Sequence, residues 1–133
     1  MDLLIINGTL INSYGTLHAD ILCRDGKIFQ IGKNLAYEND QIQKIDASGC
    51  LIFPGGIDPH VHMHLKTNSG YSADDFYSGS RAALKGGTTT LVDFVTPEKD
   101  QTLIQATELR IKEAENSLCD YSFHVSPVEW RTC

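Results

Sequence analysis

The stretch that decides the fold is FPGGIDPHVHMHL, residues 53–65, which places three of the chain's five histidines at alternate positions. Alternate side chains of an extended strand point to one face, so Asp58, His60, His62 and His64 should share a side. Imidazole is the commonest metal ligand in proteins, and two ligands on one rigid strand lose little entropy on binding. We therefore predict that His60 and His62 bind a divalent ion, and that His64 lies in the following loop. The alternative is that they are hydrogen-bonded core or surface histidines.

Composition narrows the classes of partner. The chain has 133 residues, 41% of them hydrophobic, which is enough for a packed core. A formal net charge of −6 without a basic cluster predicts no binding to nucleic acid or to an anionic membrane, so we expect a small-molecule partner. The N-terminal run MDLLIINGTLIN lacks a positive n-region and is broken by Asn7 and Gly8. It predicts neither a signal peptide nor a spanning helix, and the expected location is the cytoplasm.

The four cysteines give no metal or redox motif. Cys23, Cys50, Cys119 and Cys133 are spread along the chain without CxxC spacing, which argues against a thiolate zinc site. We expect them to be free thiols without a catalytic role.

Residues 1–52 have the pattern of a β module. Short apolar runs alternate with turn dipeptides, and Asn7-Gly8 and Asp25-Gly26 can supply the positive φ angles of two-residue hairpin turns. We therefore predict an antiparallel sheet. So thin a sheet normally needs a second layer, which we do not expect these residues to supply.

The segment SADDFYSGSRAALKGG, residues 72–87, predicts a helix. Ser72 is the expected N-cap and Asp75, three residues on, its capping-box partner. Gly86-Gly87 should end the helix with a left-handed residue.

Residues 53–133 alternate strand and helix. After residues 53–65 and the first helix come an apolar strand at 88–95, a helix at about 100–117 and a strand at 120–125. This order predicts right-handed βαβ units and a parallel sheet. We interpret it as the start of a (β/α)8 TIM barrel, which takes ~250 residues when closed, and expect the chain to be the front of a longer protein. A small doubly wound domain is the alternative, although a Gly-rich phosphate loop is missing.

LIFPGGIDPHVHMHL followed by SADDFYSGSRAALKGGTTTLVDFV resembles the amidohydrolase superfamily, and within it the dihydropyrimidinases and D-hydantoinases. The resemblance extends over essentially the whole chain and is densest from 49 to 97. PGxIDxHxH is typical of the superfamily, and SADDF with GGTTTLVDF favours the dihydropyrimidinase branch over dihydroorotases and allantoinases. It implies a module at 1–52 that is part of a β-sandwich, and the first β/α units of a TIM-barrel metal hydrolase at 53–133.

The resemblance also implies a chemistry. The family hydrolyses a dihydropyrimidine or a 5-substituted hydantoin to an N-carbamoyl amino acid, as in pyrimidine catabolism, with two divalent metal ions, usually zinc. His60 and His62 match ligands of the more buried ion. The bridging carbamylated lysine, two further histidines and the aspartate general base would lie beyond this chain, so we place no catalytic residue within it. The family forms homotetramers or dimers, and the parent protein should do the same.

Four further residues receive weaker roles. Asp58 could orient a metal-binding histidine by accepting a hydrogen bond from its second ring nitrogen, or it could be a turn aspartate. Met63 and Leu65 match a loop that closes over the substrate's substituent, although Met63 could instead pack against the barrel wall. His124 is not at a ligand position of the family, and we predict a packed or barrel-lining histidine.

Two other functional classes compete with the enzyme. One is a non-catalytic dihydropyrimidinase-like protein that keeps the fold and assembles without metal ligands, and the intact pair His60 and His62 argues against it. The other is that the 133-residue chain is itself a mature binding module. We expect the chain alone to be inactive on cyclic amides and prone to associate.

Overall fold

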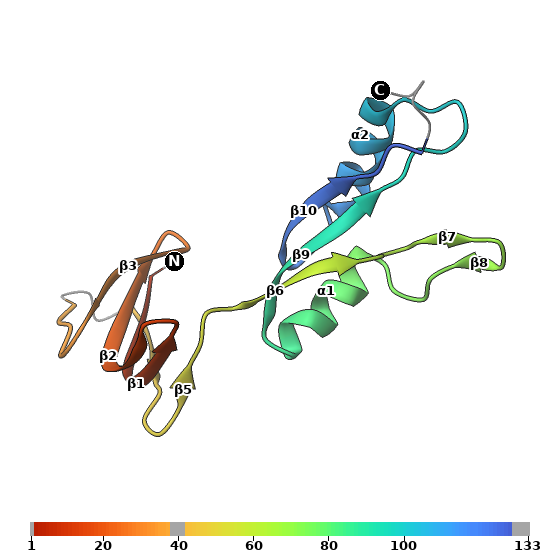
Figure 1. The fold of residues 1–133 in the computed structure, drawn as a ribbon. Coiled ribbons are helices and arrows are strands. Elements are labelled where there is room, and N and C mark those ends of the chain that lie inside the picture. The colour runs from red at the N-terminus through yellow and green to blue at the C-terminus, as the bar shows by residue number, and fades with distance from the viewer. Residues whose placement is uncertain (1, 38–41, 129–133) are drawn as a thin grey trace. The chain divides into compact units, whose positions relative to one another are not determined.

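A computed structural model describes residues 2–37 and 42–128. The chain divides into two compact units, Met1–Pro54 and Gly55–Cys133, and together they form a mixed α/β structure with small open sheets (Figure 1). Within the described ranges, no helix is both long and apolar enough to cross a membrane.

The first unit is a five-stranded mixed sheet. Its strands are β1 (Leu3–Asn12), β2 (Gly15–Arg24), β3 (Lys27–Gly32), β4 (Gln43–Asp46) and β5 (Leu51–Ile52). The order is β3-β2-β1-β4, and β5 also pairs with β1. β1, β2 and β3 are antiparallel neighbours, but β4 and β5 run parallel to β1, so the expectation of a purely antiparallel module was wrong. An apolar pattern locates a strand without giving its direction.

The predicted turn at Asn7-Gly8 is also wrong, because this dipeptide lies inside β1. Asn7 has a φ of 62°, and the ladder to β2 shifts register between Ile5 and Gly8. The Asn7 N–H donates to Oδ1 of Asp20 at 2.9 Å, so the irregularity becomes a β-bulge that keeps its hydrogen bond. The predicted turn at Asp25-Gly26 is confirmed, with φ angles of 49° and 73° between β2 and β3.

The sheet of the first unit has a small core on each face. Leu10, Ala19 and Ile21 form one cluster, against which Ile52 packs. Leu22, the next residue of β2, belongs to the other cluster with Leu4 and Ile42. The expectation that residues 1–52 supply no cover was therefore too strict, since Leu35 and Tyr37 pack on this second cluster.

The second unit contains a three-stranded parallel sheet. Its strands are β6 (Gly56–Val61), β9 (Thr88–Val95) and β10 (Asp120–Val125), in the order β10-β9-β6. A two-stranded hairpin, β7 (Lys66–Thr67) and β8 (Gly70–Tyr71), extends from the segment after β6 (Figure 1). The predicted parallel sheet is confirmed.

Two helices cover one face of this sheet. They are α1 (Phe76–Lys85) and α2 (Leu103–Ala114). The second helix is shorter than the expected range of about 100–117. Both pack against β9, and the guanidinium of Arg110 on α2 lies 4.8 Å from the ring centre of Phe76 on α1. Along β9, Leu91, Asp93 and Val95 are buried toward the helices, and the intervening residues face the other side.

The N-cap of α1 is Asp75 and not Ser72, which corrects the predicted cap. The Asp75 carboxylate accepts from the Ser78 N–H at 2.7 Å, and the Ser78 hydroxyl accepts from the Asp75 N–H at 3.1 Å. The Ser72 hydroxyl instead accepts from the Leu65 N–H at 2.8 Å and closes the loop that carries the hairpin. Ser and Asp are both strong N-caps, so sequence alone did not separate them. Gly87, with a φ of 86°, ends the helix as predicted.

The charge on the α1 cap should make stability depend on pH. The hydrogen bond from the Ser78 main chain lowers the pKa of Asp75 below its ordinary value of 3.8. The carboxylate therefore stabilises the folded chain above that value, and its contribution is lost as the pH falls through the lowered pKa. Asp75→Asn keeps a capping oxygen without the charge.

We expect Asp75→Asn to unfold at a lower urea concentration than the wild type at neutral pH, and at the same concentration in strong acid. Urea titrations followed by circular dichroism measure both midpoints. Equal midpoints at neutral pH would show that the charge contributes nothing.

Candidate functional site

The candidate site lies where the parallel strands of the second unit end. Because the carboxyl ends of parallel strands meet at one edge, side chains at the ends of β6, β9 and β10 come together. His60 is the next-to-last residue of β6, and His62 directly follows the end of that strand. Their ring centres are 5.1 Å apart, and the ring planes are nearly perpendicular, at 86°. Both histidines are exposed in this chain.

Phe94 of β9 supports the imidazoles from below. Its ring centre lies 4.5 Å from that of His60 and 5.0 Å from that of His62. His124 of β10 approaches the same ring at 4.9 Å. Phe94 follows the buried Asp93, so it points away from the helices. Three imidazoles therefore surround one aromatic ring on the sheet face that the helices do not cover.

His124 is held by a hydrogen bond to the backbone of β6. Its Nε2 lies 3.0 Å from the carbonyl oxygen of Pro59. A carbonyl only accepts, so Nε2 must carry the proton and donate. The structure thus places His124 beside the pair, exposed in this chain, and its role as a packed or barrel-lining histidine stays a prediction.

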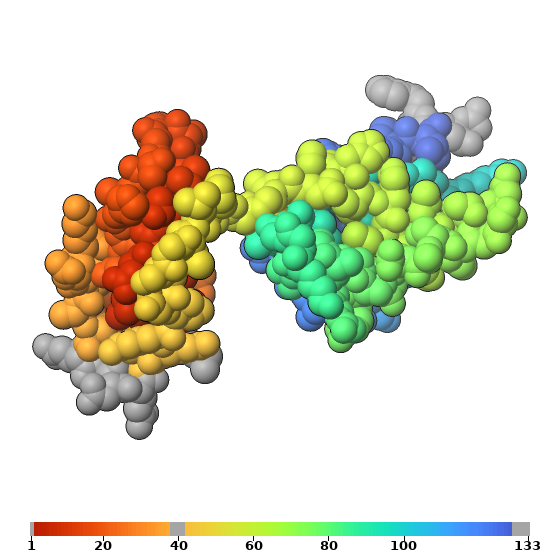
Figure 2. Space-filling model, turned by 90° about the horizontal axis from the view of Figure 1, so that it is seen from below, coloured from red at the N-terminus to blue at the C-terminus, as the bar shows by residue number. Residues whose placement is uncertain are grey.

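The other predicted site residues lie around the pair with different contacts. Asp58 accepts from the His60 main-chain N–H at 3.1 Å. Leu65 is 39% exposed on the loop, whereas Met63 is half-buried against Gly79 of α1. In Figure 2 the yellow-green segment after β6 and the green segment of α1 lie side by side at the surface. His64 has a φ of 47° and stacks on Tyr71 at 4.1 Å, in the loop where it was expected.

Sequence reasoning missed a buried ion pair behind the histidines. The Asp93 side chain is fully buried, and its Oδ1 lies 2.9 Å from Nη2 of Arg110. Its Oδ2 accepts from the Met63 N–H at 2.8 Å. A lone acid within the apolar run TTTLVDFV was a usable signal, because a buried carboxylate needs a partner. Nothing in the pattern of the second helix indicated that the partner is Arg110.

The site brings together two side chains of a type that can bind a metal ion. Across residues 2–37 and 42–128, no three or more His, Cys, Asp or Glu side chains are grouped to hold a metal. The imidazoles of His60 and His62 are compatible with sharing one ion, because two imidazoles on one tetrahedral zinc have ring centres roughly 5 Å apart. A complete site would need further ligands.

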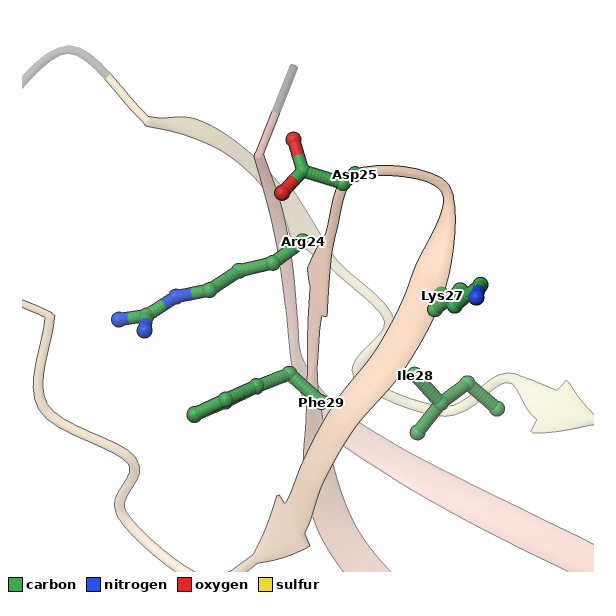
Figure 3. A pocket seen from close by; sticks show the side chains of 5 residues that line it. All are labelled: Arg24, Asp25, Lys27, Ile28 and Phe29. Atoms are coloured by element: carbon green, nitrogen blue, oxygen red, sulfur yellow. The ribbon is translucent and has the colours of Figure 1, made fainter.

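A hollow in the first unit offers different chemistry. It is lined by Arg24, Asp25, Lys27, Ile28 and Phe29 around the β2–β3 turn (Figure 3). The Arg24 guanidinium lies 4.3 Å from the ring centre of Phe29, a cation–π contact. Its lining has no histidine or cysteine, so we place the candidate site at the imidazole pair.

Comparison with known proteins assigns the family. Residues 51–128, which include the whole candidate site, match the amidohydrolase family. The chain belongs to this family. It is 43% identical to the D-hydantoinase of Geobacillus stearothermophilus over 94% of its length, and 40% identical to the dihydropyrimidinase of Rattus norvegicus over 96%. These amidohydrolase relatives are much longer, and the chain spans about a quarter of each, 26% and 25%.

Solved amidohydrolase structures match the fold as well. A crystal structure of D-hydantoinase superimposes with a TM-score of 0.87 at 43% identity, covering 94% of this chain and 27% of that one. The dihydropyrimidinase of Brevibacillus agri NCHU1002 gives 0.86 at 36% identity, covering 94% and 27%. The predicted resemblance is therefore confirmed at the level of family and of the matched fold.

The contact between Met63 and α1 can be tested through Gly79. Replacing glycine by alanine within a helix normally stabilises it by about 1 kcal/mol. Here the added methyl would lie 2.4 Å from Sδ of Met63, so the methionine must move. We expect Gly79→Ala to lose most of that gain, and to regain about 1 kcal/mol in a Met63→Ala background. Urea unfolding of the four chains measures the coupling, and strict additivity would refute the contact.

Proposed function

We propose that the natural protein containing this chain hydrolyses the ring amide of a dihydropyrimidine or a 5-substituted hydantoin to an N-carbamoyl amino acid. The observation that carries the proposal is the pair His60 and His62, side by side at the end of β6 in a chain of the amidohydrolase family. The relatives named dihydropyrimidinase and D-hydantoinase support this substrate class.

We propose that the second unit is the start of a (β/α)8 barrel and that the first is part of a β-sandwich. Three parallel strands in sequential order, with both helices on one face, support the barrel. The uncovered face would then be the barrel interior. His60, His62 and His124 would stand at the carboxyl ends of barrel strands, where barrel enzymes build their active sites.

His60 and His62 would hold the first of two divalent ions, most simply zinc. The remaining ligands, including a carbamylated lysine, would come from outside this chain. The spacing of the two rings and the exposure of both histidines fit this role. When bound, such ions lower the pKa of a water molecule and polarise the ring carbonyl of the substrate.

The chain's own residues would hold the ligands in place and shape the entrance. Phe94 limits the rotation of both imidazoles, and Asp58 fixes the main chain of His60. His124 ties β10 to β6 through the Pro59 carbonyl. Leu65 would offer apolar surface to the substituent outside the substrate ring, whereas the packing of Met63 on α1 supports a structural role for it.

Metal analysis tests the ligand assignment. In the natural protein, His60→Ala and His62→Ala should each lose at least one of about two zinc equivalents, because an imidazole donor is removed. His18→Ala is the matched control: His18 is an exposed histidine of the first unit, hydrogen-bonded to Thr9 at 2.9 Å, and zinc should be unchanged. Full zinc content in both site variants would exclude these histidines.

Turnover tests the reaction. We expect the natural protein to open dihydrouracil or hydantoin, and the isolated 133-residue chain to be inactive, since its described residues form only part of a metal site. Product formation is measured by chromatography of the N-carbamoyl acid. Zinc binding without turnover of cyclic amides would favour a non-catalytic dihydropyrimidinase-like protein, and turnover by the purified monomeric chain would refute the need for further ligands.

A further inference from the structure

We propose that Asp93 and Arg110 are positioning residues that fix the orientation of the His62 imidazole by clamping the main chain of Met63. The inference rests on the proposed function, because it assigns these residues a role toward the metal ligand. Both would act through the main chain of Met63, to which their hydrogen bonds run.

The clamp holds both polar groups of one residue. Oδ2 of Asp93 accepts from the Met63 N–H at 2.8 Å, and the Arg110 guanidinium donates to the Met63 carbonyl. The same Nη2 of Arg110 lies 2.9 Å from Oδ1 of Asp93. The peptide groups on either side of Met63 are thus fixed by a single ion pair, and the first of them begins at His62.

The clamp lies where the regular sheet no longer supports the chain. β6 ends at Val61, and its pairing with β9 shifts register between Asp58 and Val61. His60 is within the strand, but His62 is outside it. Without another restraint the backbone of His62 would have the freedom of a loop, and a ligand that is free to rotate binds an ion more weakly.

The pair is built for rigidity. The Asp93 side chain is fully buried and that of Arg110 is 12% exposed. Arg110 is held in turn by Glu113, whose Oε2 lies 2.5 Å from Nη1, and by the Phe76 ring. A guanidinium presents several donors in a fixed plane, so one group can bond Asp93, Glu113 and the Met63 carbonyl together, which a lysine ammonium cannot do in the same geometry.

Zinc affinity of the natural protein, measured by competition with a chelator, tests the proposal. Arg110→Lys keeps the charge beside Asp93 but loses the fork, and we expect zinc to bind about tenfold more weakly. Arg110→Met loses the charge as well, and the weakening should approach 100-fold. Partial retention by lysine relative to methionine is the mark of positioning.

Ser80→Ala is the matched control. Ser80 is fully buried in the same unit, and its hydroxyl accepts from the Leu118 N–H at 2.9 Å and donates to the Tyr77 carbonyl at 3.2 Å, neither of which belongs to the clamp. Its loss removes a buried hydrogen bond without touching the clamp, so zinc affinity should stay within about twofold of wild type. A loss in Ser80→Ala equal to that in Arg110→Lys would overturn the proposal, because the effect would then be general destabilisation.

His60→Ala separates the two levels of inference. If His60→Ala loses zinc while both Arg110 variants bind it like wild type, the positioning role is wrong and the proposed function stands. If His60→Ala and His62→Ala both keep zinc, the proposed function fails, and the positioning role fails with it.

Discussion

The second unit depends on one buried carboxylate. The side chain of Asp93, on the helix-covered face of β9, is fully buried. A buried charge is costly unless it is paired and hydrogen-bonded. Its partners come from two other places in the chain, Arg110 on α2 and the Met63 main chain after β6. Removing one partner of such a pair typically costs about 3–5 kcal/mol, because the other charge stays buried. This one carboxylate therefore fixes the positions of β9, α2 and the segment after β6 relative to one another.

Consecutive residues of β9 serve the two faces of the sheet. Asp93 points to the helices and secures the backbone, and Phe94 points to the other face and supports three imidazoles. This division follows from the twofold period of a strand. The structural anchor and the support of the candidate metal ligands therefore lie on opposite faces of one strand and do not compete for space. The lone acid in TTTLVDFV and the aromatic residue after it thus have separate duties.

Much of the fold was predictable, and the errors are local. The parallel order of β6, β9 and β10 follows from alternating strand and helix patterns, and it was confirmed. The Asn7-Gly8 turn was wrong because Asp20, thirteen residues away, satisfies the freed N–H and lets the strand continue as a bulge. The α1 cap was misplaced because Ser72 found a different partner, Leu65, across the loop. In both cases a contact outside the local pattern selected among conformations that the local residues allow equally.

The sequence by itself determined the family, the two β/α repeats and the spacing of His60 and His62, since each is written in the identity and period of neighbouring residues. Only the tertiary structure decided that Phe94 and His124 join these histidines, and that Arg110 pairs with Asp93 and reaches Met63. Arg110 is 17 positions from Asp93 and 47 positions from Met63 in the sequence. A periodic pattern tells which face a side chain takes, but not which distant side chain it will meet there, because that depends on how the strands and helices pack.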